Sequence, residues 1–267
     1  MLDFLRTRRM QGTRTSAFPE LVPEFPERFR GRPVFDPAIC GAAEQACPAC
    51  RGGTDSGLLV KGADGRVRLD VGASLLAPEE ALACPHGAVR HTSDHRMAAR
   101  DRGGLVTETG DLPALEALGA RMRGLFGRSL RLRSVAAGSC NGCEAELVAL
   151  GNVVFDMARF GIQFVASPRH ADGLVVTGAV SRNMRDALYR TYEAIPEPRL
   201  VIAVGACAAS GGPFRGSPEV LGGVPDDLPV DLWIGGCPPH PLTVLDGLLR
   251  LLGRLEERGT AAAPSTR

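Results

Sequence analysis

Short apolar runs alternate with longer segments of helical periodicity from about residue 129 onward. Apolar runs bounded by glycine or polar residues predict buried strands, and apolar residues that recur every three or four positions predict helices. The predicted strands are 130–136, 162–166, 173–178, 199–204 and 230–235. The predicted helices are 143–159, 182–194 and 241–256. This alternation predicts an α/β fold, in which helices cover both faces of a mostly parallel sheet.

The first 128 residues have less regular patterns. We expect an extended arm at the start, because proline is frequent there and favours extended backbone in the residue before it. Leu58–Val60 and Val67–Leu69 flank a glycine-containing turn at 62–65, which predicts a hairpin. Leucines at helical spacing between Leu112 and Leu125 predict a linker followed by a helix. The chain then divides into an arm, a small cysteine-containing segment, a linker with a helix, an α/β domain and a flexible tail: 1–33, 34–105, 106–128, 129–258 and 259–267.

The composition is that of an ordinary soluble globular protein, with 44% hydrophobic and 23% charged residues among 267. The net charge of +1 gives no overall attraction to nucleic acid, so no nucleic-acid partner is expected. No apolar stretch approaches the roughly 20 residues that cross a bilayer. Arg8-Arg9 hints at a twin-arginine export signal, but polar residues follow where an apolar stretch is required. We therefore expect a cytoplasmic protein that meets a membrane only through partners.

Four of the eight cysteines follow predicted strands of the α/β domain. Cys140 and Cys143 follow the first strand, and Cys207 and Cys237 each follow a later one. The carboxyl ends of parallel strands meet at one edge of a sheet, so three separate loops can bring four thiolates to one point. Neighbouring glycines let the backbone approach closely and donate hydrogen bonds. The pattern predicts a 4Fe–4S cluster held by Cys140, Cys143, Cys207 and Cys237.

Other interpretations of these cysteines remain open. Cys140 and Cys143 alone also suit a thiol–disulfide protein, although that chemistry leaves Cys207 and Cys237 unexplained. A structural zinc site usually takes its ligands from two close pairs, whereas here two ligands come singly from distant loops. Buried, unreactive cysteines are the remaining possibility. Glu144, next to Cys143, suits a proton relay, a subunit interface, or only the first turn of a helix, where an acid is stabilised.

Five motifs occur in order in the α/β domain: Gly138-Ser-Cys-Asn-Gly-Cys-Glu144, Ser167-Pro-Arg-His-Ala-Asp172, Thr177-Gly-Ala-Val180, Gly205-Ala-Cys207 and Gly236-Cys-Pro-Pro239. Over about 130–256 the chain resembles the small subunits of energy-converting nickel–iron hydrogenases of the formate hydrogenlyase type. These are related to the B subunit of complex I, which typically has adjacent cysteines where this chain has the spaced pair Cys140 and Cys143. The spaced pair favours the hydrogenase branch. A complex I-like subunit that passes electrons to quinone is the alternative.

The resemblance implies a flavodoxin-like fold and one 4Fe–4S cluster on the same four cysteines. It implies electron transfer between a large catalytic subunit and the clusters of a ferredoxin-like subunit, with no catalytic residue on this chain. Membrane subunits of the same complex are further implied partners. We therefore expect an oxidoreductase subunit that lies at the inner face of the cell membrane through these partners.

The segment 34–105 resembles a small α+β ferredoxin-like domain fused ahead of the small subunit. It contains the other four cysteines: Cys40, Cys47, Cys50 and Cys84. A full ferredoxin motif reads C-x₂-C-x₂-C-x₃-C-P. If Cys84 is the last cysteine of such a motif, the first three positions hold Ser74, Ala77 and Glu80 instead.

A second motif, ending at Cys47, is also incomplete. If Cys47 is its last cysteine, Cys40 is the second, and Pro37 and Ala43 occupy the first and third positions. Two hypotheses follow: the four surviving cysteines bind a second cluster, or the domain is a relic that keeps only a docking surface. The relic is favoured, because the aligned cysteines divide between two cluster positions.

Overall fold

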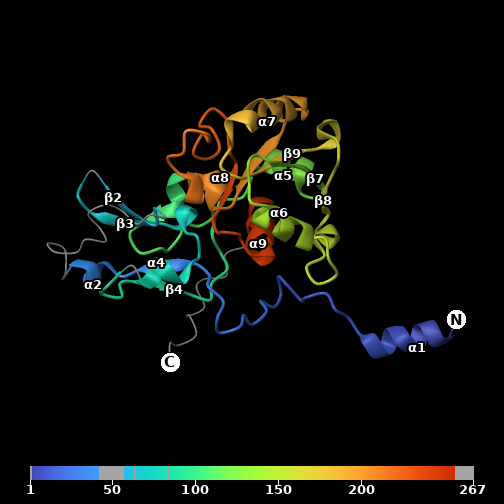
Figure 1. Cartoon of the computed structure of the whole chain (residues 1–267). Helices are drawn as coiled ribbons and strands as arrows, with labels where there is room; N and C mark the ends of the chain where they lie inside the picture. Colours follow the sequence, from blue (N-terminus) through green and yellow to red (C-terminus); the bar gives the residue numbers. More distant parts are fainter. Residues whose placement is uncertain (1, 42–56, 63, 83, 256–267) are drawn as a thin grey trace.

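A six-stranded sheet lies at the centre of the computed structural model, which describes residues 2–41, 57–62, 64–82 and 84–255 (Figure 1). The strand order is β5-β11-β10-β9-β7-β8. The strands are β5 (Ala98–Ala99), β7 (Leu130–Ala136), β8 (Ile162–Phe164), β9 (Gly173–Thr177), β10 (Leu200–Val204) and β11 (Leu232–Ile234). β7 to β11 run parallel, and β5 pairs antiparallel with β11 at one edge. The five parallel strands have the flavodoxin-like order 2-1-3-4-5, which confirms the predicted fold class.

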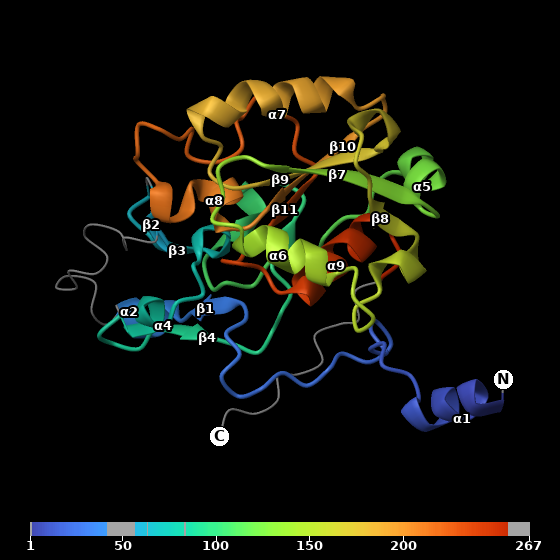
Figure 2. The ribbon, with the colours of Figure 1, turned by 45° about the vertical axis from the view of Figure 1, so that its right-hand side comes forward.

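Helices cover both faces of this sheet, as the alternating pattern predicts (Figure 2). The helices that do so include α6 (Gly142–Ala149), α7 (Arg182–Ala194), α8 (Ala206–Ser210) and α9 (Pro241–Leu251). Leu147 of α6 and Leu245 of α9 belong to the apolar core on one face. Leu188 of α7 and Ala208 of α8 belong to the core on the other face. All residues of β9 and β10 are buried, because a parallel strand between two helical layers has no solvent side.

One predicted helix, 143–159, is much shorter in the structure. α6 ends at Ala149, and a single 3-10 turn, η3 (Met157–Phe160), follows after a turn. The side chain of Asn152 accepts hydrogen bonds from the backbone amides of Val154 and Phe155. This local bonding competes with the helix and ends it.

The other predicted helices differ less. The segment 182–194 is helical throughout, whereas 241–256 ends at Leu251, before Gly253 with its φ of +68°. The helix expected in 106–128 is α5 (Ala120–Phe126). The residues before it remain extended, and there the amide of Leu118 donates to the carbonyl of Leu251 (2.8 Å).

Two small antiparallel sheets precede the α/β part. One pairs β1 (Pro33–Phe35) with β4 (Val89–His91), and the other contains β2 (Leu59–Lys61), β3 (Val67–Asp70) and β6 (Val106–Thr107). The pairing of β2 with β3 confirms the predicted hairpin. The described residues of this region include the short helical elements α2 (Pro37–Gly41), η1 (Val71–Ala73), α4 (Pro78–Leu82) and η2 (Gly103–Leu105). β5 also comes from this part of the sequence but joins the large sheet.

The expectation of an extended arm is wrong for its first residues. Leu2–Gln11 forms the helix α1, which projects away from the rest of the chain (Figures 1 and 2). This stretch has no proline or glycine, Asp3 lies in its first turn, and basic residues lie in its last turn, all of which favour a helix. Gly12, with a φ of +63°, follows its end.

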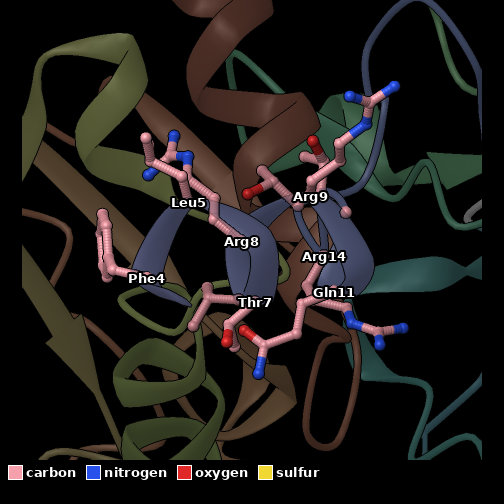
Figure 3. Close-up of a pocket in the computed structure, with 11 residues that line it drawn as sticks. Phe4, Leu5, Thr7, Arg8, Arg9, Gln11 and Arg14 are labelled. Carbon is pink, nitrogen blue, oxygen red and sulfur yellow. The ribbon is translucent and has the colours of Figure 1, made fainter. Parts of the chain in front are cut away.

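A surface hollow lies against α1. Figure 3 shows Phe4, Leu5 and Arg8 among the side chains that line it, and Val153 lines it from the α/β part. Phe4 and Leu5 are exposed, so apolar and cationic groups share this helix surface. Among the described residues, no helix has the length and apolar character that crossing a bilayer requires.

Arg102 connects the N-terminal part of the chain to the α/β part through its side chain. Its guanidinium donates to both carboxylate oxygens of Asp70, at 2.9 and 2.6 Å, and its Nε donates to the carbonyl of Ala209 at 2.6 Å. Asp70 is almost fully buried, so the guanidinium supplies the charge that its carboxylate needs. Ala209 lies in α8, the helix that carries Cys207.

We expect Arg102→Ala to lower the free energy of unfolding by about 2–3 kcal/mol, because it leaves the buried Asp70 carboxylate unpaired. Denaturant unfolding of the full chain measures this effect. Arg66→Ala is the control: Arg66 pairs with Glu108, but both side chains are largely exposed, and the loss should stay below about 1 kcal/mol. Equal losses in the two variants would contradict this account of Arg102.

Candidate metal centre

The loop after β7 carries Cys140 and Cys143. Asn141, with a φ of +70°, reverses the backbone before α6, so that Cys143 lies buried in the first turn while Cys140 stays exposed. The amino end of α6 therefore points its free backbone amides and partial positive charge towards this loop. The preceding Gly138 packs against Gly178 of the loop after β9: a Cβ on Gly178 would lie 2.7 Å from the carbonyl carbon of Gly138.

Cys207 comes from the loop after β10, at the start of α8. Gly205 ends β10 with a φ of +93°, and a Cβ on it would lie 2.5 Å from the sulfur of Cys143. Only glycine leaves room for this contact between the two loops. On the other side, a Cβ on Gly212 would lie 2.8 Å from the sulfur of Cys207. Two separate glycines therefore make space for thiols.

Cys237 comes from the third loop, after β11. The amide of Ala206 donates to the carbonyl of Gly236 at 2.8 Å, which holds the second and third loops together. A Cβ on Gly142 would lie 3.7 Å from Pro238 and 3.5 Å from the sulfur of Cys140. The first loop thus contacts the third as well, and all three meet at one edge of the sheet.

Burial and nearby cysteines raise the pKa values of three of the four thiols. Burial raises the pKa of Cys207 to about 11, with Cys237, Cys140 and Glu144 adding to the shift. Burial also raises the pKa of Cys143, and Glu144 and the other three cysteines add to it. For Cys237, burial and then Cys140 raise the pKa. Each thiolate would repel the others, and a cationic metal centre offsets such repulsion.

The donor set fits an iron–sulfur cluster. Four thiolates from glycine-rich loops are the soft ligands that such clusters take, and the loops expose further backbone amides. Among residues 2–41, 57–62, 64–82 and 84–255, no three His, Cys, Asp or Glu side chains are arranged to hold one metal ion. Within these ranges, the sulfurs of the four predicted ligands do not form a site for a single ion.

Glu144 is held by two hydroxyls that the sequence did not single out. The Ser139 hydroxyl donates to its carboxylate at 2.6 Å, and the buried Thr177 hydroxyl, at the end of β9, donates to the same oxygen. The other carboxylate oxygen is buried without a hydrogen-bond partner among the described residues. Ser139 and Thr177 lie in two of the five motifs, but the sequence does not indicate that they contact Glu144.

The N-terminal cysteines are described only in part. Cys40 and Cys84 are half-buried and pack beside the apolar cluster that contains Phe35 and Leu69. Cys47 and Cys50 lie outside the described residues. A second cluster on these four cysteines therefore stays a hypothesis.

Comparison with known proteins agrees with the motifs. The family model described as "NADH ubiquinone oxidoreductase, 20 Kd subunit" matches residues 140–251, which include all four α/β cysteines. Formate hydrogenlyase subunit 7 of Escherichia coli is 40% identical over 168 residues, which are 63% of this chain and 66% of that protein. The chain thus spans slightly less than two thirds of that relative.

Two further relatives come from different complexes. The probable membrane-bound hydrogenase subunit mbhJ of Pyrococcus furiosus is 39% identical over 150 residues, covering 56% of this chain and 90% of that protein. The B subunit of the NADH-quinone oxidoreductase of Heliobacterium modesticaldum is 45% identical over 115 residues, or 43% of this chain and 66% of that protein. These matches confirm the resemblance predicted from the motifs. The chain belongs to the family of the 20 kDa subunit of NADH–ubiquinone oxidoreductase, together with these subunits of hydrogenase and quinone-reducing oxidoreductases.

Proposed function

We propose that this chain is an electron-transfer subunit that holds one 4Fe–4S cluster on Cys140, Cys143, Cys207 and Cys237. The observation that supports the proposal is the approach of three loops: Gly205 leaves room for the sulfur of Cys143, and the amide of Ala206 donates to the carbonyl of Gly236. Family membership supports it, because the named relatives are subunits of oxidoreductases.

When bound, such a cluster supplies a redox centre that gains and loses single electrons. The chain would contribute the protein environment around this cluster. Cys143 and Cys207 are buried and exclude water, which strengthens the effect of nearby charges and hydrogen bonds. Cys140 is exposed, so one side of the site faces the surface where a partner subunit can approach. We infer that no substrate bond is broken on this chain.

We propose a large catalytic subunit and a ferredoxin-like subunit as the electron-transfer partners, in a hydrogenase complex of the formate hydrogenlyase type. The identities with formate hydrogenlyase subunit 7 and mbhJ support this branch, as does the spaced pair Cys140 and Cys143. The relative mbhJ is named as part of a membrane-bound hydrogenase. By analogy, membrane subunits of the same complex would hold this chain at the inner face of the cell membrane.

The second candidate is a complex I-like subunit that passes electrons to quinone. The 45% identity with the B subunit of an NADH-quinone oxidoreductase favours it. The two candidates differ in the partner complex: purified with its partners, a hydrogenase complex produces or consumes hydrogen, whereas a complex I-like assembly reduces quinone and does neither.

We expect about four irons and four sulfides per chain after anaerobic purification, the content of one 4Fe–4S cluster. Cys237→Ser should lose most of this iron, because it removes one ligand while the loop contacts through Gly236 remain. Cys84→Ser is the control and should keep it. Chemical analysis measures the iron and sulfide content of the wild type and of both variants.

Other metal contents would contradict the proposal. Colourless protein loaded with zinc would support an interaction module stabilised by zinc, and metal-free protein with dithiol activity would support a thiol–disulfide role. About eight irons per chain, halved by Cys84→Ser, would show that the N-terminal segment holds a second cluster and is not a relic.

Gly205→Ala should also lose most of the iron, although no ligand is changed. Its methyl group would lie 2.5 Å from the sulfur of Cys143, and the φ of +93° is unfavourable for alanine. Gly65→Ala introduces alanine at a similar φ of +79° in open space, and should keep its iron. If both variants bound iron as the wild type does, the contact between Gly205 and Cys143 would have no part in cluster binding.

A further inference from the structure

A buried polar network occupies the positions where a ferredoxin motif ending at Cys84 would have its first three ligands. These positions hold Ser74, Ala77 and Glu80. The Ser74 hydroxyl donates to one carboxylate oxygen of Glu80 at 2.8 Å, and the amide of Leu75 donates to the other at 2.7 Å. The network therefore joins two of the three positions directly.

His91 of β4 completes this network. Its Nε2 lies 3.3 Å from the carbonyl oxygen of Ala77 and 3.8 Å from the carboxylate of Glu80. Ser74 is fully buried, and Glu80 is only 5% exposed. A carboxylate with so little access to water persists because its acceptor oxygens are used within the protein. Ser74 and Glu80 thus contact each other, His91 connects Ala77 to them, and the network holds a charge in place of metal ligands.

The network adjoins the loop of Cys237. The turn η1, which directly precedes Ser74, packs against the end of β11: a Cβ on Gly235 would lie 2.9 Å from the carbonyl oxygen of Val71 and 3.4 Å from Cα of Gly72. Gly235 is two residues from Cys237. After burial and Cys140, the charge of Glu80 also raises the pKa of Cys237, so the carboxylate is within electrostatic reach of that sulfur.

We propose that Glu80 is a positioned negative charge that lowers the reduction potential of the cluster held in part by Cys237. This inference rests on the proposed function. Reduction adds an electron, and a carboxylate in a medium of low dielectric constant opposes added negative charge nearby. Ser74 and the Leu75 amide fix the carboxylate in place, so that its effect on the cluster is constant. The ferredoxin-like segment would then act on the electron path through charge instead of through a cluster of its own.

Glu80→Gln tests this role, because it removes the charge and keeps the size of the side chain. The matched control is Glu79→Gln, which removes the same charge from the neighbouring, exposed residue of α4. The full chain of each variant is purified anaerobically, and the midpoint potential is measured by redox titration followed by electron paramagnetic resonance. All variants are titrated at the same pH.

We expect Glu80→Gln to keep its iron and to shift the midpoint potential to a more positive value, with a smaller shift in Glu79→Gln. His91→Gln, which disturbs the network and keeps the Glu80 carboxylate, should resemble the wild type. An unchanged potential in Glu80→Gln, or equal shifts in both glutamate variants, would overturn the role of Glu80. Loss of the cluster from Glu80→Gln would overturn it too, since Glu80 would then be structural. Wild-type protein without iron would instead overturn the proposed function itself.

Discussion

The contact among three loops at one edge of the sheet is the constraint on which the candidate site depends. The amide of Ala206 donates to the carbonyl of Gly236, and Gly205 leaves space for the thiol of Cys143. Both contacts involve the backbone and neither joins two thiols, so the fold of the backbone itself brings the thiols together. The order of the parallel strands makes this possible, because β10 and β11 are neighbours and β7 lies on the other side of β9.

This arrangement gathers groups that repel one another when ionised. Three of the four thiols have raised pKa values, chiefly through burial, and the carboxylates of Glu144 and Glu80 add negative charge beside them. A protein keeps such a grouping at the expense of stability unless a cationic centre compensates it. The same charges would favour the oxidised state of a bound cluster. Binding and tuning of the proposed cluster would therefore have a common physical basis.

The sequence predicts the parts of this structure that follow from local pattern. The fully apolar strands β9 and β10, helix α7, and the cysteines after three strands are all found where expected. It does not predict α8 and β5, which are short and stabilised mainly by their neighbours, or the end of α6, which depends on the side chain of Asn152. In the sequence, Ser74 and Glu80 stand only where cysteines are missing from a motif. Their network with His91 cannot be predicted there, because only the tertiary fold brings His91 to Glu80.

The most direct test of the central claim is anomalous diffraction at the iron absorption edge, from crystals of the full chain grown anaerobically. We predict one compact group of iron atoms, with the sulfurs of Cys140, Cys143, Cys207 and Cys237 all at bonding distance from it. Iron bound elsewhere, or a group that leaves Cys207 or Cys237 without a bond to iron, would contradict the account.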